Sequence, residues 1–338
     1  MTVLVTGAAG FIGSHLTERL LADGQAVVGL DLFDDFYDPA IKEQNLARAR
    51  EHAGFRDVRG DVRDHALLTG LPDDVDAVVH LAARAGVRPS IQQPALYTSV
   101  NVDGTVALLE FARERGIDNL IFASSSSVYG NNEKVPFAEG DPVDHPISPY
   151  AATKKSGELL CHSHHHLHGI GVMALRLFTV YGPRQRPDLA IHKFSGLMSE
   201  GRPIPMYGDG TTERDYTYID DIVAGVMGAL DYLRANPRTY EVVNLAENRT
   251  VSLNEMIRVL GEELGIEPQI ERFPLQPGDV TRTYADISKA RRLFGYHPTT
   301  DFREGIRRFV RWFEEKRVHR RPNYRADSTS VPEKSPPL

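Results

Sequence analysis

The chain has 338 residues, 41% hydrophobic and 25% charged, with a formal net charge of -7 at pH 7. That length and composition fit a globular protein of two lobes, and the acidic balance argues against a nucleic-acid or anionic-membrane partner, because both select a basic surface. No apolar run approaches the roughly 20 residues that span a bilayer, and the single cysteine, Cys161, is interpreted as a buried thiol in a reducing, cytoplasmic setting.

The first half of the chain alternates short apolar runs with helical patterns. Val3–Val5 predicts a strand that ends in glycines, Phe11–Leu21 has the apolar spacing of a helix, and Gln25–Asp31 predicts a second strand. Four more strands, each separated by enough chain for a helix, are predicted at Phe55–Arg59, Ala77–Leu81, Leu120–Ser124 and Val172–Arg176. Because parallel neighbours need such crossovers, residues 1–178 are predicted to form a Rossmann-type, doubly wound parallel sheet.

After Phe178 the chain is punctuated by glycine and proline, which predicts a lobe rich in ligand-facing loops. Ile219–Leu233 predicts a helix and Tyr240–Leu245 a strand, so residues from about 214 to 246 are expected to rejoin the first sheet. The stretches 179–213 and 247–318, the latter with a helix at Leu253–Leu264, are then expected to form a smaller C-terminal α/β substrate lobe. The polar, proline-rich tail at 320–338 is expected to be disordered.

A glycine triplet follows the first strand in Thr6-Gly7-Ala8-Ala9-Gly10-Phe11-Ile12-Gly13. In a strand-to-helix turn, such glycines permit a tight turn, close backbone approach to a pyrophosphate and close helix packing. The exposed amides and the positive helix end then hold the phosphates. The alternative is a plain tight turn. The residues expected to contact a dinucleotide here are Gly7, Gly10, Phe11, Ile12 and Gly13.

Asp31 ends the second predicted strand, 18 residues beyond Gly13. A carboxylate at that place accepts hydrogen bonds from the ribose hydroxyls of NAD and repels a 2′-phosphate, so NAD is favoured over NADP. The alternative is a turn-initiating aspartate, since three more aspartates follow closely. By position alone, Asp61, Val62, Leu81, Ala82 and Ala83 are also expected at the cofactor. Asn101 is a further candidate, with a local hydrogen bond or helix packing as its alternative.

Tyr150 and Lys154 lie one helical turn apart after Ser148-Pro149, a pair that places Tyr150 at a helix start. We predict that the Lys154 ammonium and a nicotinamide cation lower the pKa of the phenol, so that Tyr150 acts as a general base. In isolation this spacing also describes an exposed helix pair. The serine run Ser124–Ser127 favours the catalytic interpretation, because it ends a strand at the edge where doubly wound sheets bind ligands.

Together these motifs resemble the extended short-chain dehydrogenase/reductase family, in its nucleotide-sugar epimerase branch. The resemblance extends to about residue 315 and includes the serine run before Val128-Tyr129-Gly130 and Arg214-Asp215-Tyr216-Thr217-Tyr218-Ile219-Asp220-Asp221. Within that branch, Ala85-Gly86-Val87-Arg88, Phe178-Thr179-Val180-Tyr181-Gly182-Pro183 and Arg186-Pro187-Asp188 are similar to UDP-glucuronate 4-epimerases.

The resemblance implies an NAD-dependent isomerase that epimerises C4 of UDP-glucuronate, giving UDP-galacturonate through a 4-keto intermediate. Tyr150 would remove the O4 proton, Lys154 would orient the ribose, and Ser125 would bind O4. Because a 4-keto uronic acid loses CO2 readily, the carboxylate must be held in an unfavourable geometry for that loss. The hydroxyl residues expected to do this are Ser126, Ser127 and Thr179, although Thr179 is also an ordinary strand-end residue.

The resemblance also implies a UDP site and a homodimer. Arg214 and Arg186 are expected to bind the diphosphate, Tyr207 to stack on uracil, Asp279 to accept from the uridine ribose, and Arg88 to lie near phosphate or sugar. No metal is expected: His162 and His166 share a helical face, but no metalloprotease pattern accompanies them.

Three other functions stay open from the sequence. A UDP-glucose/UDP-galactose 4-epimerase would not need a carboxylate site, and a UDP-glucuronate decarboxylase, a lyase, would release CO2. A non-catalytic NAD-binding protein would keep only the fold, although intact Tyr150, Lys154 and Ser125 argue against it.

Overall fold

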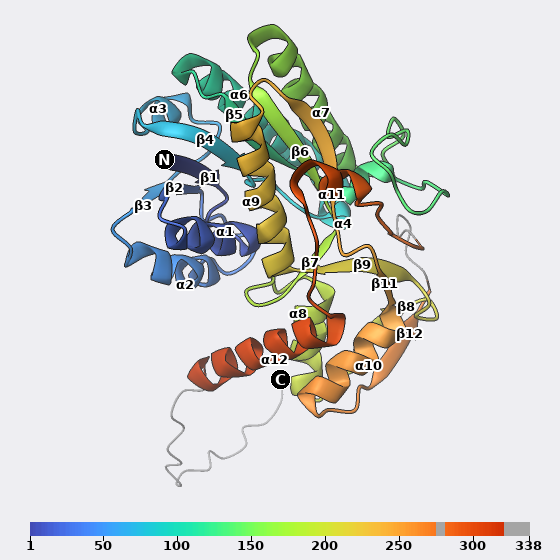
Figure 1. Cartoon of the computed structure of the whole chain (residues 1–338). Helices are drawn as coiled ribbons and strands as arrows, with labels where there is room; N and C mark the ends of the chain where they lie inside the picture. The colour runs from blue at the N-terminus through green and yellow to red at the C-terminus, as the bar shows by residue number, and fades with distance from the viewer. Residues whose placement is uncertain (275–280, 321–338) are drawn as a thin grey trace, which may run out of the picture.

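Seven parallel strands form the central sheet, in the order β10-β6-β5-β4-β1-β2-β3 (Figure 1). The computed structural model describes residues 1–274 and 281–320. The strands of this sheet are β1 (Thr2–Thr6), β2 (Ala26–Asp31), β3 (Phe55–Arg59), β4 (Val75–His80), β5 (Asn119–Ser125), β6 (Gly171–Leu177) and β10 (Tyr240–Leu245). Every pair of neighbours in it is parallel.

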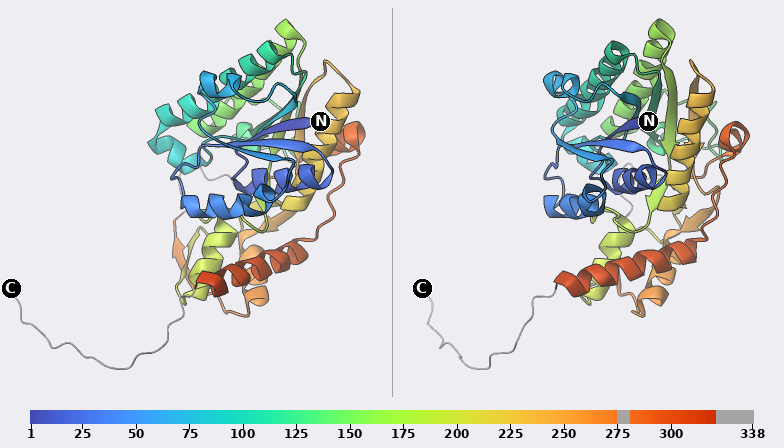
Figure 2. Two further views of the ribbon diagram at one scale, coloured as in Figure 1. Left: turned by 90° about the vertical axis from the view of Figure 1, so that its left-hand side faces the viewer. Right: turned by 60° about the vertical axis from the view of Figure 1, so that its left-hand side comes forward.

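Helices cover both faces of the sheet (Figure 2), which fits its inner strands, because β1, β2, β5 and β6 are almost entirely buried. All five residues of β1 are buried, and they alternate between two cores. Val3 and Val5 belong to the core beneath α1, whereas Leu4 belongs to the core beneath α6. The helices are α1 (Phe11–Ala22), α2 (Pro39–Arg50), α3 (His65–Thr69), α4 (Val87–Gln92), α5 (Pro94–Thr98), α6 (Gly104–Arg115), α7 (Pro149–His168), α8 (Ala190–Ser199), α9 (Ile219–Ala235), α10 (Leu253–Leu264), α11 (Ser288–Phe294) and α12 (Phe302–Arg320).

Two short segments connect these elements near the carboxyl ends of the strands. The π-helical segment η1 (Ser99–Asp103) joins α5 to α6, and the 3-10 turn η2 (Ser126–Tyr129) follows β5 directly. In Figure 2, α1, α2 and α9 lie on one side of the sheet, and α6 and α7 lie on the other.

The second lobe lies beyond the carboxyl end of the sheet and is built around two small sheets (Figure 1). One has the order β11-β9-β7 and the other pairs β12 with β8. α8, α10 and α12 pack against one another there. The strands of this lobe are β7 (Thr179–Tyr181), β8 (Ile204–Tyr207), β9 (Glu213–Tyr218), β11 (Thr250–Ser252) and β12 (Ile270–Phe273).

The predicted α/β class and Rossmann-type parallel sheet are confirmed. The strand predicted at Tyr240–Leu245 pairs with β6 at the edge of the large sheet, with Tyr240 opposite Val172. Asp279 and the predicted tail beyond Arg320 lie outside the described residues. Within the described part of the chain, no helix combines the length and the apolar content that crossing a bilayer requires.

Candidate active site

The glycine turn between β1 and α1 has the geometry that a bound phosphate requires. Gly7 has φ +71°, a left-handed conformation that favours glycine, and its N–H donates to the Leu30 carbonyl at 2.8 Å. A Cβ on Gly13 would lie 2.1 Å from the Gly7 carbonyl oxygen, so the helix can approach the turn this closely only without a side chain there. The amides at the start of α1 are therefore open to an anionic ligand.

Asp31 is the last residue of β2, and its side chain holds this turn through hydrogen bonds to the backbone. Its carboxylate accepts hydrogen bonds from the Ala9 N–H at 3.1 Å and the Phe33 N–H at 2.8 Å, and the Lys42 ammonium lies 3.9 Å away. Burial raises the pKa of Asp31, while these two amides and Lys42 act to lower it. The glycine cradle and the carboxylate at the strand end together fit the pyrophosphate and ribose of a dinucleotide.

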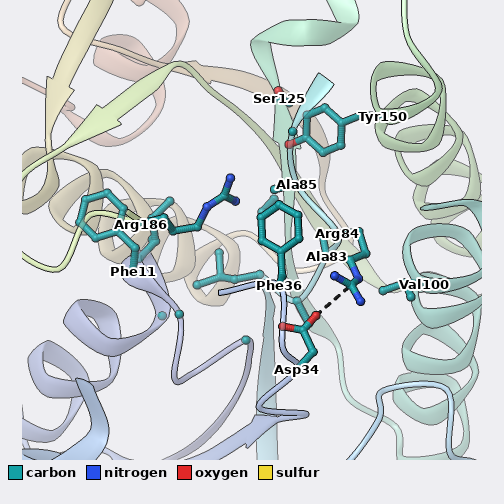
Figure 3. Close-up of a pocket in the computed structure, with 18 of the residues that line it drawn as sticks. Phe11, Asp34, Phe36, Ala83, Arg84, Ala85, Val100, Ser125, Tyr150 and Arg186 are labelled. Carbon is teal, nitrogen blue, oxygen red and sulfur yellow. Dashed lines mark ion pairs between the residues drawn. The ribbon is translucent and has the colours of Figure 1, made fainter. Parts of the chain in front are cut away.

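The carboxyl ends of the parallel strands open into a cavity of about 470 Å³, which we call the first cavity. Figure 3 shows Ser125, Tyr150 and Arg186 in this cavity, together with Phe11 from the start of α1. Of the residues predicted at the cofactor or the sugar, those that line it are Gly7, Gly10, Phe11, Ile12, Gly13, Asp31, Asp61, Val62, Leu81, Ala82, Ala83, Ser125, Ser126, Ser127, Tyr150, Lys154, Thr179 and Arg186.

Asn101 is not among the residues that line the first cavity, so its contact with the cofactor stays a prediction. Its side-chain oxygen accepts from the Arg84 N–H at 2.7 Å, and its amide nitrogen donates to the Arg84 carbonyl and to the Thr153 hydroxyl, each at 3.0 Å. All of these bonds are internal. Asn101 therefore joins the loop after β4 to α7 through long-range hydrogen bonds, which differ from the local hydrogen bond that was its alternative.

Tyr150 stands in the first turn of α7, where its phenol faces Ser125 (Figure 3). Ser148 caps the helix by accepting from the Ala151 N–H at 3.1 Å, and Pro149 fills the first helical position, where no N–H is needed. Tyr97 packs edge-on against the Tyr150 ring, with centroids 6.3 Å apart. The phenol is thus oriented by its helix and by a neighbouring ring.

The pKa of Tyr150 differs from the sequence-based prediction. Burial raises it, and the groups that act to lower it are a hydrogen bond with Ser125 and the positive charge of Arg186. Lys154 is not one of those groups: its Nζ donates to the Ala123 carbonyl at 2.7 Å and lies 6.0 Å from the centroid of the Tyr150 ring. Burial lowers the pKa of Lys154 itself to about 8. Among the charged groups of the protein, Arg186 is therefore the one that acts to lower the pKa of Tyr150, and the joint effect of Lys154 and a bound nicotinamide stays a prediction.

The serine run divides its hydroxyls between two sides of the sheet edge. Ser125 Oγ accepts from the Ser127 N–H and donates to Ser127 Oγ, both at 3.1 Å, which fixes these two side chains at the cavity. Ser124 Oγ instead donates to Glu158 at 2.6 Å. The alternation follows from the pleat of β5, which sends successive side chains to opposite faces.

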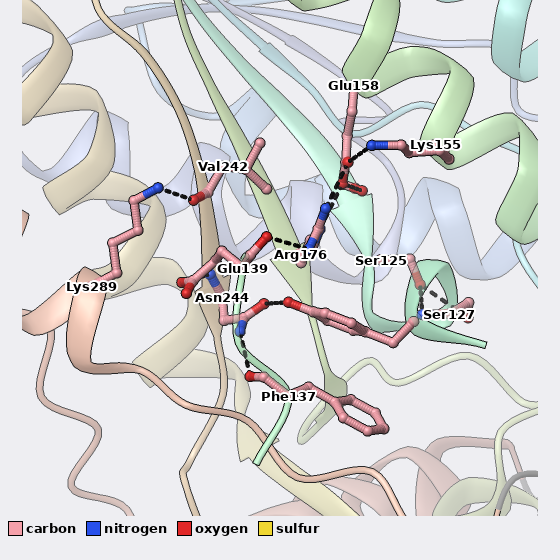
Figure 4. Close-up of polar contacts among 12 residues, drawn as sticks. Ser125, Ser127, Phe137, Glu139, Lys155, Glu158, Arg176, Val242, Asn244 and Lys289 are labelled. Atoms are coloured by element: carbon pink, nitrogen blue, oxygen red, sulfur yellow. Dashed lines mark hydrogen bonds and ion pairs between the residues drawn. The ribbon is translucent and has the colours of Figure 1, made fainter. Parts of the chain in front are cut away.

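A buried ion pair behind the cavity was not predicted from the sequence. Arg176 of β6 makes two hydrogen bonds of 2.9 Å to the carboxylate of Glu158 in α7 (Figure 4), and both side chains are at most 2% exposed. Arg176 and the Ser124 hydroxyl hold the pKa of Glu158 low against the effect of burial. A basic residue near the end of the otherwise apolar run Val172–Leu177 was the signal that could have revealed it.

The same network continues toward the second lobe. Arg176 lies over the Tyr129 ring, 4.8 Å from its centroid, and the Tyr129 hydroxyl donates to Asn244 at 2.7 Å. The Asn244 amide then donates to the Phe137 carbonyl (Figure 4) and to the Asp286 carbonyl. Polar contacts therefore connect α7, the edge of the sheet and the segment that follows residue 281.

A second cavity of about 240 Å³ lies in the lobe and holds three of the residues predicted to bind UDP, Arg88, Tyr207 and Arg214. The Arg88 guanidinium lies over the Tyr207 ring, 5.2 Å from its centroid, on the face that the predicted uracil stack would use or share. Arg186 is not with Arg214 but lines the first cavity. Asp188, which lines the second cavity, forms a two-pronged ion pair with Arg186, so the two cavities adjoin at this pair.

The loop after β2 contributes cavity residues that sequence reasoning did not assign. Asp34, Phe36 and Tyr37 line the first cavity, and Asp34 forms an ion pair of 3.4 Å with Arg84 (Figure 3). From the sequence, the aspartates near Asp31 counted only in favour of a turn at that position, and none was assigned to a cavity. No spacing rule assigns a loop aromatic to a cavity, because its direction depends on contacts from other loops.

The remaining candidates lie away from both cavities. The histidine cluster ends α7, where His164 contacts Glu110 at 2.9 Å, and Cys161 is fully buried in the core. Residues 1–274 and 281–320 contain no group of three or more histidine, cysteine, aspartate or glutamate side chains placed to hold a metal ion.

Comparison with known proteins gives consistent matches along nearly the whole chain. Residues 4–309 match the family described as GDP-mannose 4,6 dehydratase. The UDP-glucuronate 4-epimerase of Thermodesulfobacterium geofontis is 41% identical over 315 residues, which cover 92% of this chain and 96% of that protein. UDP-glucuronate 4-epimerase 1 of Arabidopsis thaliana is 43% identical over 332 residues, covering 93% of this chain and 76% of that one.

A solved structure is similar over the same extent. The crystal structure of UDP-glucuronic acid 4-epimerase from Bacillus cereus, in complex with UDP-glucuronic acid and NAD, superposes with a TM-score of 0.86 at 38% identity. The match covers 94% of this chain and 100% of that chain.

Proposed function

Since this chain belongs to the family described as GDP-mannose 4,6 dehydratase, within the extended short-chain dehydrogenase/reductases, we propose that it is an NAD-dependent UDP-glucuronate 4-epimerase. It is an isomerase that interconverts UDP-glucuronate and UDP-galacturonate. The observation that carries the proposal is the first cavity, where a dinucleotide cradle, the Tyr150 phenol and a set of hydroxyls meet.

The glycine turn and Asp31 hold the dinucleotide. The amides at the start of α1 bind the pyrophosphate, and the Asp31 carboxylate accepts from the ribose hydroxyls. When bound, NAD supplies a reversible oxidant for C4, so that the sugar passes through a 4-keto form and is reduced on its other face.

Tyr150 moves the proton. Its phenolate oxygen takes the O4 proton as the C4 alcohol is oxidised and returns it when the ketone is reduced. Ser125 faces this phenol from the end of β5 and lies where it can bind O4 (Figure 3). The Arg186 charge favours the phenolate against the cost of burial, and Lys154 holds its ammonium on the Ala123 carbonyl at the same edge of the sheet.

Ser126, Ser127, Thr179 and Arg186 hold the sugar carboxylate. The three hydroxyl residues line the first cavity together with Arg186. Two nitrogens of Arg186 are engaged with Asp188, which leaves further N–H donors for an anion. Its proximity to Tyr150 supports a role at the acid end of the sugar, in place of the diphosphate role expected from the sequence. A carboxylate held by several donors cannot turn freely into the geometry that releases CO2.

The second cavity binds the UDP moiety. Arg214 and Arg88 provide positive charge for the diphosphate, and Tyr207 provides an aromatic face. The second cavity adjoins the first at the Arg186–Asp188 ion pair. One extended nucleotide sugar can therefore occupy both cavities.

Product analysis tests the proposal. The purified protein is incubated with UDP-glucuronate, without added NAD, and the nucleotide sugars are separated by chromatography. UDP-galacturonate is expected, and its absence with bound NAD present would contradict the assignment. Release of CO2 with a UDP-pentose would identify a decarboxylase instead. Inertness toward UDP-glucuronate with conversion of UDP-galactose would identify a hexose epimerase.

We also propose a homodimer that forms in the cytoplasm. The support for pairing is the family expectation together with α7, which leaves Leu159 57% and Leu167 69% exposed. Pairing through this helix would cover both side chains. Sedimentation of the wild-type protein and of a Leu159→Lys variant tests it: the wild type is expected to sediment at twice the mass of the variant.

A further inference from the structure

The segment 32–38, which follows β2, is anchored at both of its ends. At its start Phe33 adopts φ +55°, a strained conformation for a bulky residue, and its ring lies under Arg59, 4.3 Å from the guanidinium carbon. Toward its end, Tyr37 packs under the buried Lys42 ammonium, 5.0 Å from the ring centroid. A strained residue that persists is held by its surroundings, so this segment has a defined path.

Phe36 lies between two arginines that come from different parts of the fold. The Arg84 guanidinium carbon is 5.6 Å from the centroid of its ring, and that of Arg186 is 5.2 Å away. Figure 3 shows the ring between these two side chains, in the middle of the first cavity. Both distances are within the range of cation–π attraction.

Each arginine is itself held by a carboxylate. Arg84, in the loop after β4, pairs with Asp34 of the same segment, and Arg186, in the loop after β7, pairs with Asp188. Asp34 also pairs with Lys42. The contacts therefore run from the cofactor side of the cavity, through Phe36, to the arginine that lies beside Tyr150.

We propose that Phe36 is a latch that retains the bound dinucleotide between turnovers. The inference rests on the proposed function, because NAD that is oxidised and reduced within one turnover has no need to leave. Four residues of segment 32–38, Leu32, Asp34, Phe36 and Tyr37, line the cavity in which the dinucleotide is proposed to bind, so release of the dinucleotide would require Phe36 to leave both arginines. Phe36 touches the cofactor site without taking part in the proton transfer.

The test is the rate of NAD release. Protein loaded with radiolabelled NAD is mixed with excess unlabelled NAD, and the retained label is measured after rapid desalting at increasing times. Phe36→Ala is expected to release NAD about tenfold faster than wild type, since it loses both cation–π contacts. Phe36→Leu, which keeps the bulk and loses the π face, is expected to lie between the two.

Matched controls separate a latch from a general loss of structure. Asp35→Ala changes an exposed residue of the same segment that does not line the cavity, and its release rate is expected to equal that of wild type. The unfolding temperature of the NAD-free Phe36→Leu protein is expected to stay within about 2 °C of wild type, whereas a general loss of structure would lower it by more.

The outcomes distinguish the latch from the function on which it rests. Tight NAD binding by wild type with an unchanged release rate in Phe36→Ala and Phe36→Leu would overturn the latch alone. A wild-type protein that binds no NAD would overturn both. Faster release from the variants, in a protein that converts no nucleotide sugar, would support the latch and contradict the epimerase.

Discussion

The two cavities hold their charged groups by different means. In the first, Lys154 is 5% exposed and fixed on a strand carbonyl, and Tyr150 is placed by a capped helix at the end of the large sheet. In the second, Arg88 rests on the Tyr207 ring, and Arg214 projects from β9 with a hydrogen bond to the Glu213 carbonyl. The charged group of the first cavity is thus held by buried backbone, whereas those of the second cavity lie at the ends of long side chains of the lobe.

The difference fits the chemistry that each cavity is proposed to perform. Proton transfer requires a fixed distance and a controlled pKa, which the ends of buried parallel strands provide. Binding of a diphosphate requires positive charge and several N–H donors, which flexible arginines provide from a less rigid base. Substitutions in the first cavity should therefore change turnover or cofactor binding, and those in the second should change substrate affinity.

The largest effect is expected from Tyr150→Phe. Losing the phenol removes the base, so kcat is expected to fall by a factor of about 100 or more, while NAD binding is preserved. Steady-state kinetics and NAD titration measure the two quantities. Tyr232→Phe, which changes a hydroxyl far from both cavities, serves as the control and is expected to match wild type. Near-normal turnover in Tyr150→Phe would remove the catalytic role of the first cavity.

Gly13→Ala is expected to weaken NAD binding by about tenfold to 100-fold, because a Cβ 2.1 Å from the Gly7 carbonyl forces the turn to open. Fluorescence titration with NAD measures the change. Gly196→Ala is the matched control: it adds a Cβ within a helix where no atom lies within 4 Å. Wild-type affinity in Gly13→Ala would show that the cradle does not set cofactor binding.

Arg214→Met sharpens the comparison from the side of the second cavity. The loss of a charged hydrogen-bond donor is expected to raise KM for the UDP-sugar about tenfold and to leave kcat within about twofold. Arg202→Met removes an exposed arginine that pairs with Glu200 outside both cavities, and no change is expected. A fall in kcat without a rise in KM would contradict the proposal that the second cavity serves substrate binding and the first cavity serves turnover.

The smallest effect is expected on stability, from the ionisation of two carboxyl groups at β9, Asp215 and Glu247. Burial raises the pKa of Asp215 to about 7 and that of Glu247 to about 8, and Glu247 Oε2 is buried without a hydrogen-bond partner among the described residues. Both folded-state values exceed those of the unfolded chain, about 4. The folded chain therefore binds more protons between about pH 4 and 8, and the free energy of unfolding falls as the pH rises through that window.

Glu247→Gln removes one of these two titrations. The midpoint of thermal unfolding is expected to rise by about 2 °C at pH 8 and to stay at the wild-type value at pH 5, where Glu247 is protonated. Calorimetry at the two pH values measures the difference. Glu271→Gln, on an exposed strand, provides the control at both values. An equal shift at pH 5 and pH 8 would show that ionisation of Glu247 is not the cause.

Much of the first cavity was predictable because its residues occupy fixed places in a repeating unit. Gly7, Gly13 and Asp31 stand at the start and end of one strand–helix–strand unit, and the helix that begins at Pro149 follows from the Ser-Pro pair before Tyr150. The separation of Arg186 from Arg214 was not predictable. Arg186 lies in the loop after β7 and Arg214 lies in β9, and only packing decides which cavity each one enters.

The sequence by itself determined the parallel sheet, the dinucleotide cradle and the Tyr150–Lys154 helix, because each depends on local periodicity or on spacing within a single unit. Tertiary structure alone decided that Arg186 supports the phenol, that Asn101 turns inward, and that Phe36 lies between Arg84 and Arg186. These contacts join residues that are 36 to 150 positions apart in the chain. Their free energy depends on which side chains the folded backbone brings together, and no local rule specifies that.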